Sequence, residues 1–185
     1  MEYFDLRNPD GSVTGEIKER SAVHRDGDLH GASHVWIARK HPETGKIELL
    51  LQKRSENKDS YPGCLDISAA GHLGAGDEYL PCAIRELEEE LGIRADAKDL
   101  QFLFMYHCDV EEVFHGSLFK NREISAVYLY SKPVEADKLM LQREEVESVC
   151  WVDLEECRRQ VKAGNPAYCL LEDELEQLKV QLSDF

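Results

Sequence analysis

Three glutamates, Glu86, Glu89 and Glu90, lie within five residues of one another in the segment GHLGAGDEYLPCAIRELEEELGI, residues 71–93. On a helix, at about 100° per residue, they share one strip on the side opposite an apolar stripe. Like charges this close cost about a few tenths of a kcal/mol per pair, which a hard divalent cation would relieve. Mg²⁺ prefers carboxylate oxygens and retains waters that a phosphate can displace. The spacing therefore favours a Mg²⁺ site, while a solvated acidic face is the alternative for ELEEEL alone.

The residues around these glutamates supply the rest of such a site. The apolar stripe consists of Leu80, Ile84, Leu87 and Leu91. Before the helix stand three glycines, where backbone can approach a ligand or metal closely: Gly71, Gly74 and Gly76. Arg85 follows Asp77 by eight residues, so it can pair with that acid at the helix entrance and orient it. Gly92 is a typical stop signal for the helix.

Taken together, these residues resemble the Nudix box, written G-x5-E-x7-R-E-U-x-E-E-x-G-U with U aliphatic. The matching positions are Gly71, Asp77, Arg85, Glu86, Leu87, Glu89, Glu90, Gly92 and Ile93. Asp77 stands where the family has Glu, and Glu78 follows it. The resemblance implies an α/β/α sandwich in which the three glutamates, joined by the Gly71 carbonyl, hold Mg²⁺ or Mn²⁺. It also implies that Arg85 and Asp77 orient the site.

A looser likeness covers about residues 24–130 and is similar to the layout of isopentenyl diphosphate isomerase and its hydrolase relatives. Its landmarks are the stretches 29–32 (LHGA), 52–54 (QKR), 61–63 (YPG) and 70–72 (AGH). By this resemblance His30 and His72 match two histidines of the isomerase metal site, and His24 approximates a third. Glu123 matches one glutamate of that site, and Asn121 stands where the other would be.

Ala70 separates this chain from an active isomerase, which needs a cysteine immediately before Gly71. A methyl side chain cannot donate or accept a proton, so we expect the isomerase chemistry to be disabled. His30 and His72 then remain as a candidate second metal site. Ordinary hydrogen-bonded histidines near the cleft are the alternative.

Lys53, Arg54 and Lys58 form a local positive cluster in an acidic chain. Arginine makes paired hydrogen bonds to phosphate, so the cluster is a candidate diphosphate-binding site. A solvated strand end and loop is the alternative for each of the three.

We therefore expect metal-dependent hydrolysis of a diphosphate linkage in a small molecule, with nucleoside diphosphates or their derivatives first. Thiamine diphosphate and prenyl diphosphates follow, and an isomerase or a catalytically inactive binding module are the other classes. A carboxylate would take the proton from the attacking water. The candidate catalytic residues are Glu86, Glu90 and Glu123, with Arg85, and Glu111 and Glu112 are further candidates for the base.

The pattern of the chain predicts a single α/β domain over residues 1–185, with helices on a central mixed sheet. An N-terminal hairpin is expected over about 1–20. Further strands are expected at 33–39, 47–53, 65–70, 100–107, 124–130 and 146–152. Helices are expected at 77–91, at 153–163 after an Asp153 N-cap, and at 170–182, so that the C-terminal helices occupy about 153–182.

Bulk properties narrow the functional class. The net charge of −15 disfavours a nucleic acid polymer as partner. The six cysteines form no C-x-x-C pair and are expected to be free thiols. The sequence predicts neither a signal peptide nor a membrane span, which favours a cytoplasmic protein. Its expected partner is a small-molecule diphosphate, and a homodimer is an open alternative to a monomer.

Overall fold

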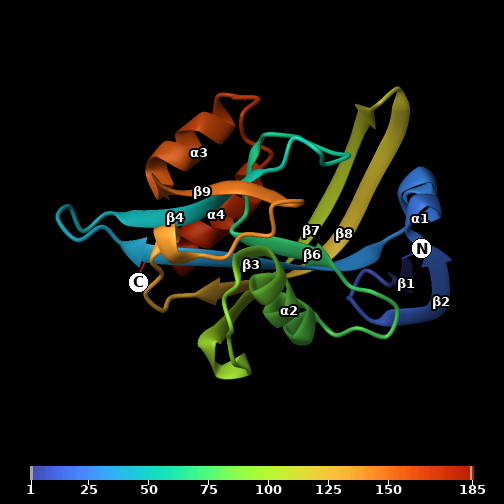
Figure 1. The fold of residues 1–185 in the computed structure, drawn as a ribbon. Helices are drawn as coiled ribbons and strands as arrows, with labels where there is room; N and C mark the ends of the chain where they lie inside the picture. Colours follow the sequence, from blue (N-terminus) through green and yellow to red (C-terminus); the bar gives the residue numbers. More distant parts are fainter. Residues whose placement is uncertain (1, 184) are drawn as a thin grey trace.

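One mixed sheet organises the chain, and β3 lies at its centre (Figure 1). The computed structural model describes residues 2–183 and 185, so Met1 of the predicted hairpin and Asp184 of the predicted domain lie outside the described residues. The strands are β1 (Tyr3–Arg7), β2 (Val13–Glu19), β3 (His30–Lys40), β4 (Ile47–Arg54), β5 (Leu65–Asp66), β6 (Ala69–His72), β7 (Leu100–Phe114), β8 (Ser117–Tyr130) and β9 (Val146–Asp153). The helices are α1 (Arg20–Asp26), α2 (Tyr79–Leu91), α3 (Leu154–Lys162) and α4 (Glu172–Gln181), with short 3-10 turns η1 (Ala97–Asp99) and η2 (Ala136–Lys138).

Strand pairing makes the sheet mixed. β3 pairs antiparallel with β1, β4 and β6 and parallel with β8. β8 continues antiparallel with β7, and β4 also pairs with β5 and β9. β1 and β2 form the predicted N-terminal hairpin. The mixed sheet and its helices confirm the predicted α/β fold.

The alternation of side chains along β3 divides the core into two layers. Val35 and Ile37 pack with Leu87 in one cluster under α2. Trp36 and Ala38 point the other way, into a second cluster that includes the buried leucines of α3 and α4. Helices thus cover both faces of β3, as Figure 1 shows, and this explains why the strand is buried over most of its length.

Helix α2 begins two residues later than predicted and ends where Gly92 predicts. Asp77 lies in the preceding loop, where its side chain accepts a hydrogen bond from the Gly74 amide at 3.1 Å. Gly92 has a φ of 70°, and a side chain there would come within 2.8 Å of Met140. Leu87 is buried as predicted, whereas Leu80 and Ile84 are only half-buried because they lie at the edge of the apolar stripe.

The sequence did not predict two segments around the site. α1 was not anticipated, and β7 and β8 run on to a tight turn at His115 and Gly116, well beyond the predicted ends at 107 and from 124. Alternation in the outer hairpin is weak because many of its side chains are exposed on both faces. The long hairpin projects from the body of the sheet in Figure 1.

The predicted strand over 65–70 is two separate strands. β5 pairs with β4, whereas β6 pairs with β3, so the segment crosses from one neighbour to the other. At the crossing the Ser68 hydroxyl donates to the Leu50 carbonyl at 2.6 Å and accepts from the Ile37 amide at 2.8 Å. That side chain takes over the hydrogen bonds that a continuous ladder would have made.

The remaining C-terminal elements follow the prediction closely. Asp153 caps α3 by accepting from the Glu156 amide at 2.9 Å, and Gly164 lies just beyond the end of this helix. Among the described helices, none combines the length and apolar character needed to cross a membrane.

Candidate active site

A cleft of about 840 Å³ opens between α2, the long β7–β8 hairpin and the loops after β4 and before β9. β3 and β6 supply its floor, and α4 closes one end. The three glutamates of the 71–93 segment, His72 and Glu123 all line it. The fold therefore brings most of the predicted site residues to one place.

Gly71 lies in β6 against the side chain of Glu86 from α2. A Cβ on Gly71 would fall 2.2 Å from Glu86 Cδ, far inside van der Waals contact. Glycine is therefore required here for β6 and α2 to approach each other. The approach leaves the main chain of Gly71 beside the Glu86 carboxylate.

Glu90 is buried, with only 6% of its surface exposed, which corrects the prediction of one strip opposite the apolar stripe. Its Oε2 accepts from Gln52 Nε2 at 3.0 Å and from the Ala70 amide at 3.2 Å. Burial, reinforced by the nearby Glu86 carboxylate, raises the pKa of Glu90 to about 8. On the helical wheel Glu90 lies at the border of the stripe, and the sheet covers that border.

Glu86 and Glu89 have different surroundings from Glu90. Glu86 is half-buried in the cleft, and burial raises the pKa of its carboxyl. Glu89 is exposed at the cleft rim. The burial of the three carboxylates therefore decreases from Glu90 at the sheet, through Glu86, to Glu89 at the solvent.

Arg85 joins the loop before α2 to the carboxylate helix. Its Nη1 lies 2.7 Å from Asp77 Oδ2, so the shorter acid still makes the pairing that the box requires. Its Nη2 donates to Glu86 Oε1 at 3.1 Å and to the His72 carbonyl at 3.3 Å. These bonds raise the pKa of Arg85 above its usual range, led by the bond to Asp77.

The carboxylate set fits a hard, hydrated cation. Glu90 accepts hydrogen bonds only from neutral groups, and no cationic side chain lies within ion-pair distance of it among the described residues. The three glutamates do not converge as tightly as the histidine group described below. Oxygen donors at this looser spacing suit Mg²⁺, which keeps several of its own waters.

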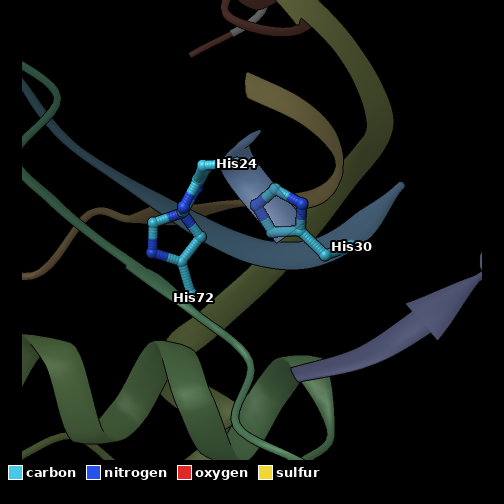
Figure 2. A group of neighbouring side chains, drawn as sticks. All are labelled: His24, His30 and His72. Carbon is cyan, nitrogen blue, oxygen red and sulfur yellow. The ribbon is translucent and has the colours of Figure 1, made fainter. Parts of the chain in front are cut away.

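His24, His30 and His72 form a second group, shown in Figure 2, of which His72 lines the cleft. Their ligand atoms lie within 4.8 Å of one another, although the residues come from α1, β3 and β6. Each Nε2 is buried without a hydrogen-bond partner. Burial lowers the pKa of His24 to about 3 and that of His30 to about 4, which leaves neutral imidazoles. Neutral imidazole nitrogens without partners are potential metal ligands.

Glu123 lies beside the histidine group. Its Oε1 makes ion-pair contacts at 2.9 Å with His72 Nε2 and at 3.8 Å with His30 Nε2. Burial alone would raise the pKa of Glu123, but His72, His30 and His34 outweigh it and hold the pKa below its ordinary range. The carboxylate is thus charged and held by histidines.

His34 was missed by the sequence interpretation, because its partner lies 140 residues away. Its Nδ1 lies 3.0 Å from Glu174 Oε1 of α4, and the same oxygen accepts from Trp36 Nε1 at 2.9 Å. Burial opposes a charge on His34, but Glu174 overcomes it and raises the pKa to about 9. No local spacing signals this pair, since only the packing of α4 on β3 creates it.

The basic cluster splits in two because adjacent residues of β4 point to opposite faces. Arg54 lines the cleft and pairs with Asp66 at 2.8 Å. Lys58 also lines it and pairs with Glu145. Lys53 instead pairs with exposed Glu147 and lies outside the cleft lining.

Some of the other candidate residues line the cleft and others do not. Glu111 and Glu112 are exposed on the outer part of β7 and do not line it. Arg20 of α1 does line it, paired with Glu2 at 2.8 Å, and was not identified from the sequence. The cysteines are free, as predicted: Cys64, Cys82, Cys108, Cys150, Cys157 and Cys169.

Comparison with known proteins adds family information. Residues 29–172 match the model of the NUDIX domain. Nudix hydrolase 3 of Arabidopsis thaliana is 46% identical over 171 residues, which is 90% of this chain but 21% of that protein. A Nudix hydrolase of Clostridium acetobutylicum is 34% identical over 158 residues, covering 85% of this chain and 73% of the relative.

Solved structures resemble the whole fold. A Deinococcus radiodurans protein superimposes with a TM-score of 0.72 at 19% identity, covering 95% of this chain and 98% of the other. An Ap4A hydrolase of C. elegans does so with a TM-score of 0.55 at 23% identity, covering 84% and 98%. At these identities the likeness is one of fold.

Proposed function

Because the chain belongs to the NUDIX family and is a Nudix hydrolase, we propose that it cuts a diphosphate linkage in a small molecule with the help of a divalent metal ion. The observation that carries the proposal is the approach of β6 to α2. It places the Gly71 main chain, half-buried Glu86 and buried Glu90 along one wall of the cleft.

Glu86, Glu89 and Glu90, with the carbonyl of Gly71, would hold Mg²⁺ or Mn²⁺. The bound ion would neutralise charge that develops on the phosphoryl oxygens. Arg85 would hold Glu86 in place through the bond to Oε1, while Gln52 and the Ala70 amide fix Glu90. These bonds would position the proposed site before substrate arrives.

We assign the general base to Glu86. Glu90 uses its Oε2 for two hydrogen bonds and is more deeply buried. Glu123 is held charged by histidines, which weakens it as a base. Glu86, like Glu90, keeps one oxygen free of described hydrogen bonds, but it is less deeply buried and therefore more open to an attacking water.

Arg54 and Lys58 are the proposed diphosphate-binding residues, because both face the cleft. Lys58 would exchange Glu145 for a phosphate oxygen, and Arg54 is already oriented by Asp66 and by the Ser60 carbonyl. Lys53 is not carried into the proposal, since it lies outside the lining and is paired with Glu147.

The substrate we place first is a nucleoside diphosphate or a derivative. The lining of the cleft is mainly charged and polar, which suits a polar organic group better than a prenyl chain. One of the structural neighbours is named as an Ap4A hydrolase, in line with this choice. Thiamine diphosphate and prenyl diphosphates are the alternatives to be tested beside it.

We propose that the histidine group, which resembles the metal site of the isomerase branch, is a second metal site. The convergence of the three histidines, with Glu123 beside His72, favours it. Ala70 lies in β6 with its amide bound to Glu90 and offers no thiol. We therefore propose that the site serves binding and that isomerisation is absent.

Incubation of the protein with Mg²⁺ and a panel of diphosphates, followed by measurement of released phosphate or monophosphate, tests the proposal. We expect hydrolysis of at least one nucleotide substrate and its loss in Glu86→Gln. Turnover of isopentenyl to dimethylallyl diphosphate above a metal-only control would contradict the assignment. An inactive binding module would bind a diphosphate without cutting any of the panel.

A further inference from the structure

The loop that leads into α2 is held from outside by the N-terminal hairpin. The Ala75 amide donates to the Tyr3 carbonyl at 2.8 Å, and the Gly76 amide donates to Asp5 Oδ2 at 2.7 Å. Arg7 Nη2 donates to the Asp77 carbonyl at 3.3 Å. Three consecutive loop residues are therefore bound to alternate positions of β1.

Alternation along β1 explains this match. In a strand, residues two apart share a face, so Asp5 and Arg7 point to the same side. Arg7 is fixed in addition by a bond from Nη1 to the Gly11 carbonyl at 3.0 Å. Its guanidinium also lies 5.1 Å from the centre of the Tyr79 ring, at the first residue of α2. The hairpin thus binds both the loop and the start of α2.

The held loop carries the one position at which the chain departs from the box. Asp77 is one methylene shorter than the family's Glu, yet it reaches Arg85 at 2.7 Å. Arg85 in turn holds Glu86. Because the Asp77 side chain is one methylene shorter, its contact with Arg85 depends on where the loop backbone lies, and the backbone at Ala75, Gly76 and Asp77 is what β1 binds.

We propose that Asp5 and Arg7 are positioning residues that compensate for the short acid at position 77. They hold the loop backbone at the distance that Asp77 needs to reach Arg85, and so keep Glu86 oriented in the cleft. Both residues lie before the region 29–172 that matches the family domain. The catalytic consequence rests on the proposed function, but the positioning itself does not.

The test combines hairpin and loop substitutions. Arg7→Met and Asp5→Ala are each made with Asp77 and with Asp77→Glu, and Ile17→Ser on exposed β2 is the matched control. Asp5→Asn keeps an acceptor oxygen and is the conservative rescue. The readouts are exchange of the Gly76 amide by NMR, calorimetric Mg²⁺ affinity, the melting temperature and the rate of diphosphate hydrolysis.

Loss of one such hydrogen bond is expected to speed Gly76 exchange and weaken Mg²⁺ binding by about tenfold. Leu50 and other core amides should be unaffected, and Ile17→Ser should behave as wild type. Asp77→Glu alone should weaken Mg²⁺ binding because the held loop fixes the backbone of residue 77 at the distance that suits the shorter side chain. The same change should restore binding in Arg7→Met and Asp5→Ala.

The inference would be overturned by unchanged Gly76 exchange, or by Asp77→Glu having the same effect with and without the hairpin contacts. Loss of affinity only in step with a lower melting temperature would also overturn it. Should Arg7→Met not fold, Asp5→Ala and Asp5→Asn decide alone. If no diphosphate were cut, the proposed function would fail while exchange and Mg²⁺ affinity still decided this inference.

Discussion

The carboxylates of α2 and the histidine group meet at one cleft, which His72 lines, but the two groups are assembled in opposite ways. Glu86, Glu89 and Glu90 lie within five residues of sequence and spread from the buried sheet to solvent. His24 and His72 lie far apart in sequence, yet with His30 they converge within 4.8 Å. Local spacing predicts which residues share a helix, whereas strand register decides which residues meet.

Register explains how His30, His72 and Glu123 meet, whereas the packing of α1 adds His24. His30 of β3 lies opposite Glu123 of β8, and Ala32 lies opposite His72 of β6. A shift of one residue would turn either side chain to the other face of the sheet. Because the two sites are assembled differently, we expect them to respond differently to substitution, metal and pH.

The largest expected effect is on catalysis at the carboxylate site. Glu90→Gln should lower Mg²⁺-dependent hydrolysis by about 100-fold or more, because a charged ligand is lost where transition-state charge develops. Its melting temperature in EDTA should be preserved or raised. Glu88→Gln is the control, since Glu88 is exposed on the same helix and pairs with Arg94. Normal turnover in Glu90→Gln would make the carboxylates structural.

A change on the buried side of the same helix should do the reverse. Leu87→Ala removes a fully buried side chain and should lower the free energy of unfolding by about 2–5 kcal/mol. The rate per folded molecule should stay near that of wild type, measured at a temperature where both are folded. Leu80→Ala, at a half-buried position, should cost less. A Leu87→Ala protein that is stable but inactive would contradict this separation.

The change of stability with pH should have opposite signs for the two regions. In metal-free protein the pKa of Glu90 is raised from 4.5 to about 8, so the folded state binds more protons than the unfolded state between these values. Stability therefore falls as pH rises through that window, by about 1.4 kcal/mol for each pKa unit of difference. Glu90→Gln should remove this loss in urea unfolding curves recorded in EDTA.

The histidines should act in the opposite direction. The pKa of His24 is lowered from 6.5 to about 3, so the unfolded state binds more protons between these values. Stability should rise with pH across that window, and His24→Gln should flatten the rise. If Glu90→Gln and His24→Gln changed the slope of stability against pH in the same direction, the contrast between the two regions would be contradicted.

The smallest expected effect is that of the histidines on the Mg²⁺ reaction. His24→Gln and His30→Gln should change Mg²⁺-dependent hydrolysis by less than about tenfold, because imidazole ligands favour softer metals than Mg²⁺. Both should weaken Zn²⁺ or Co²⁺ binding followed by titration after EDTA treatment. His107→Gln, at an exposed site on β7, is the control. Unchanged Zn²⁺ affinity would reduce the group to hydrogen-bonded histidines.

The sequence could predict those features that depend on residues close together in the chain. The α/β fold, the N-terminal hairpin, the Asp153 cap and the Arg85–Asp77 pair depend on neighbours close in sequence, and all were predicted. The burial of Glu90 was not, because the wheel cannot show that Gln52 of β4 and β6 cover one border of the helix. His34 and Glu174 were missed for the same reason.

Calorimetric titration with Mg²⁺ tests the central claim most directly, since it needs no knowledge of the substrate. The wild type, Glu89→Gln/Glu90→Gln and His24→Gln/His30→Gln are compared after EDTA treatment, with their folding checked by thermal melting. We predict Mg²⁺ binding by the wild type and by the histidine variant, and its loss in the folded glutamate variant. Equal Mg²⁺ binding by the wild type and the glutamate variant would contradict the assignment of the metal site to α2.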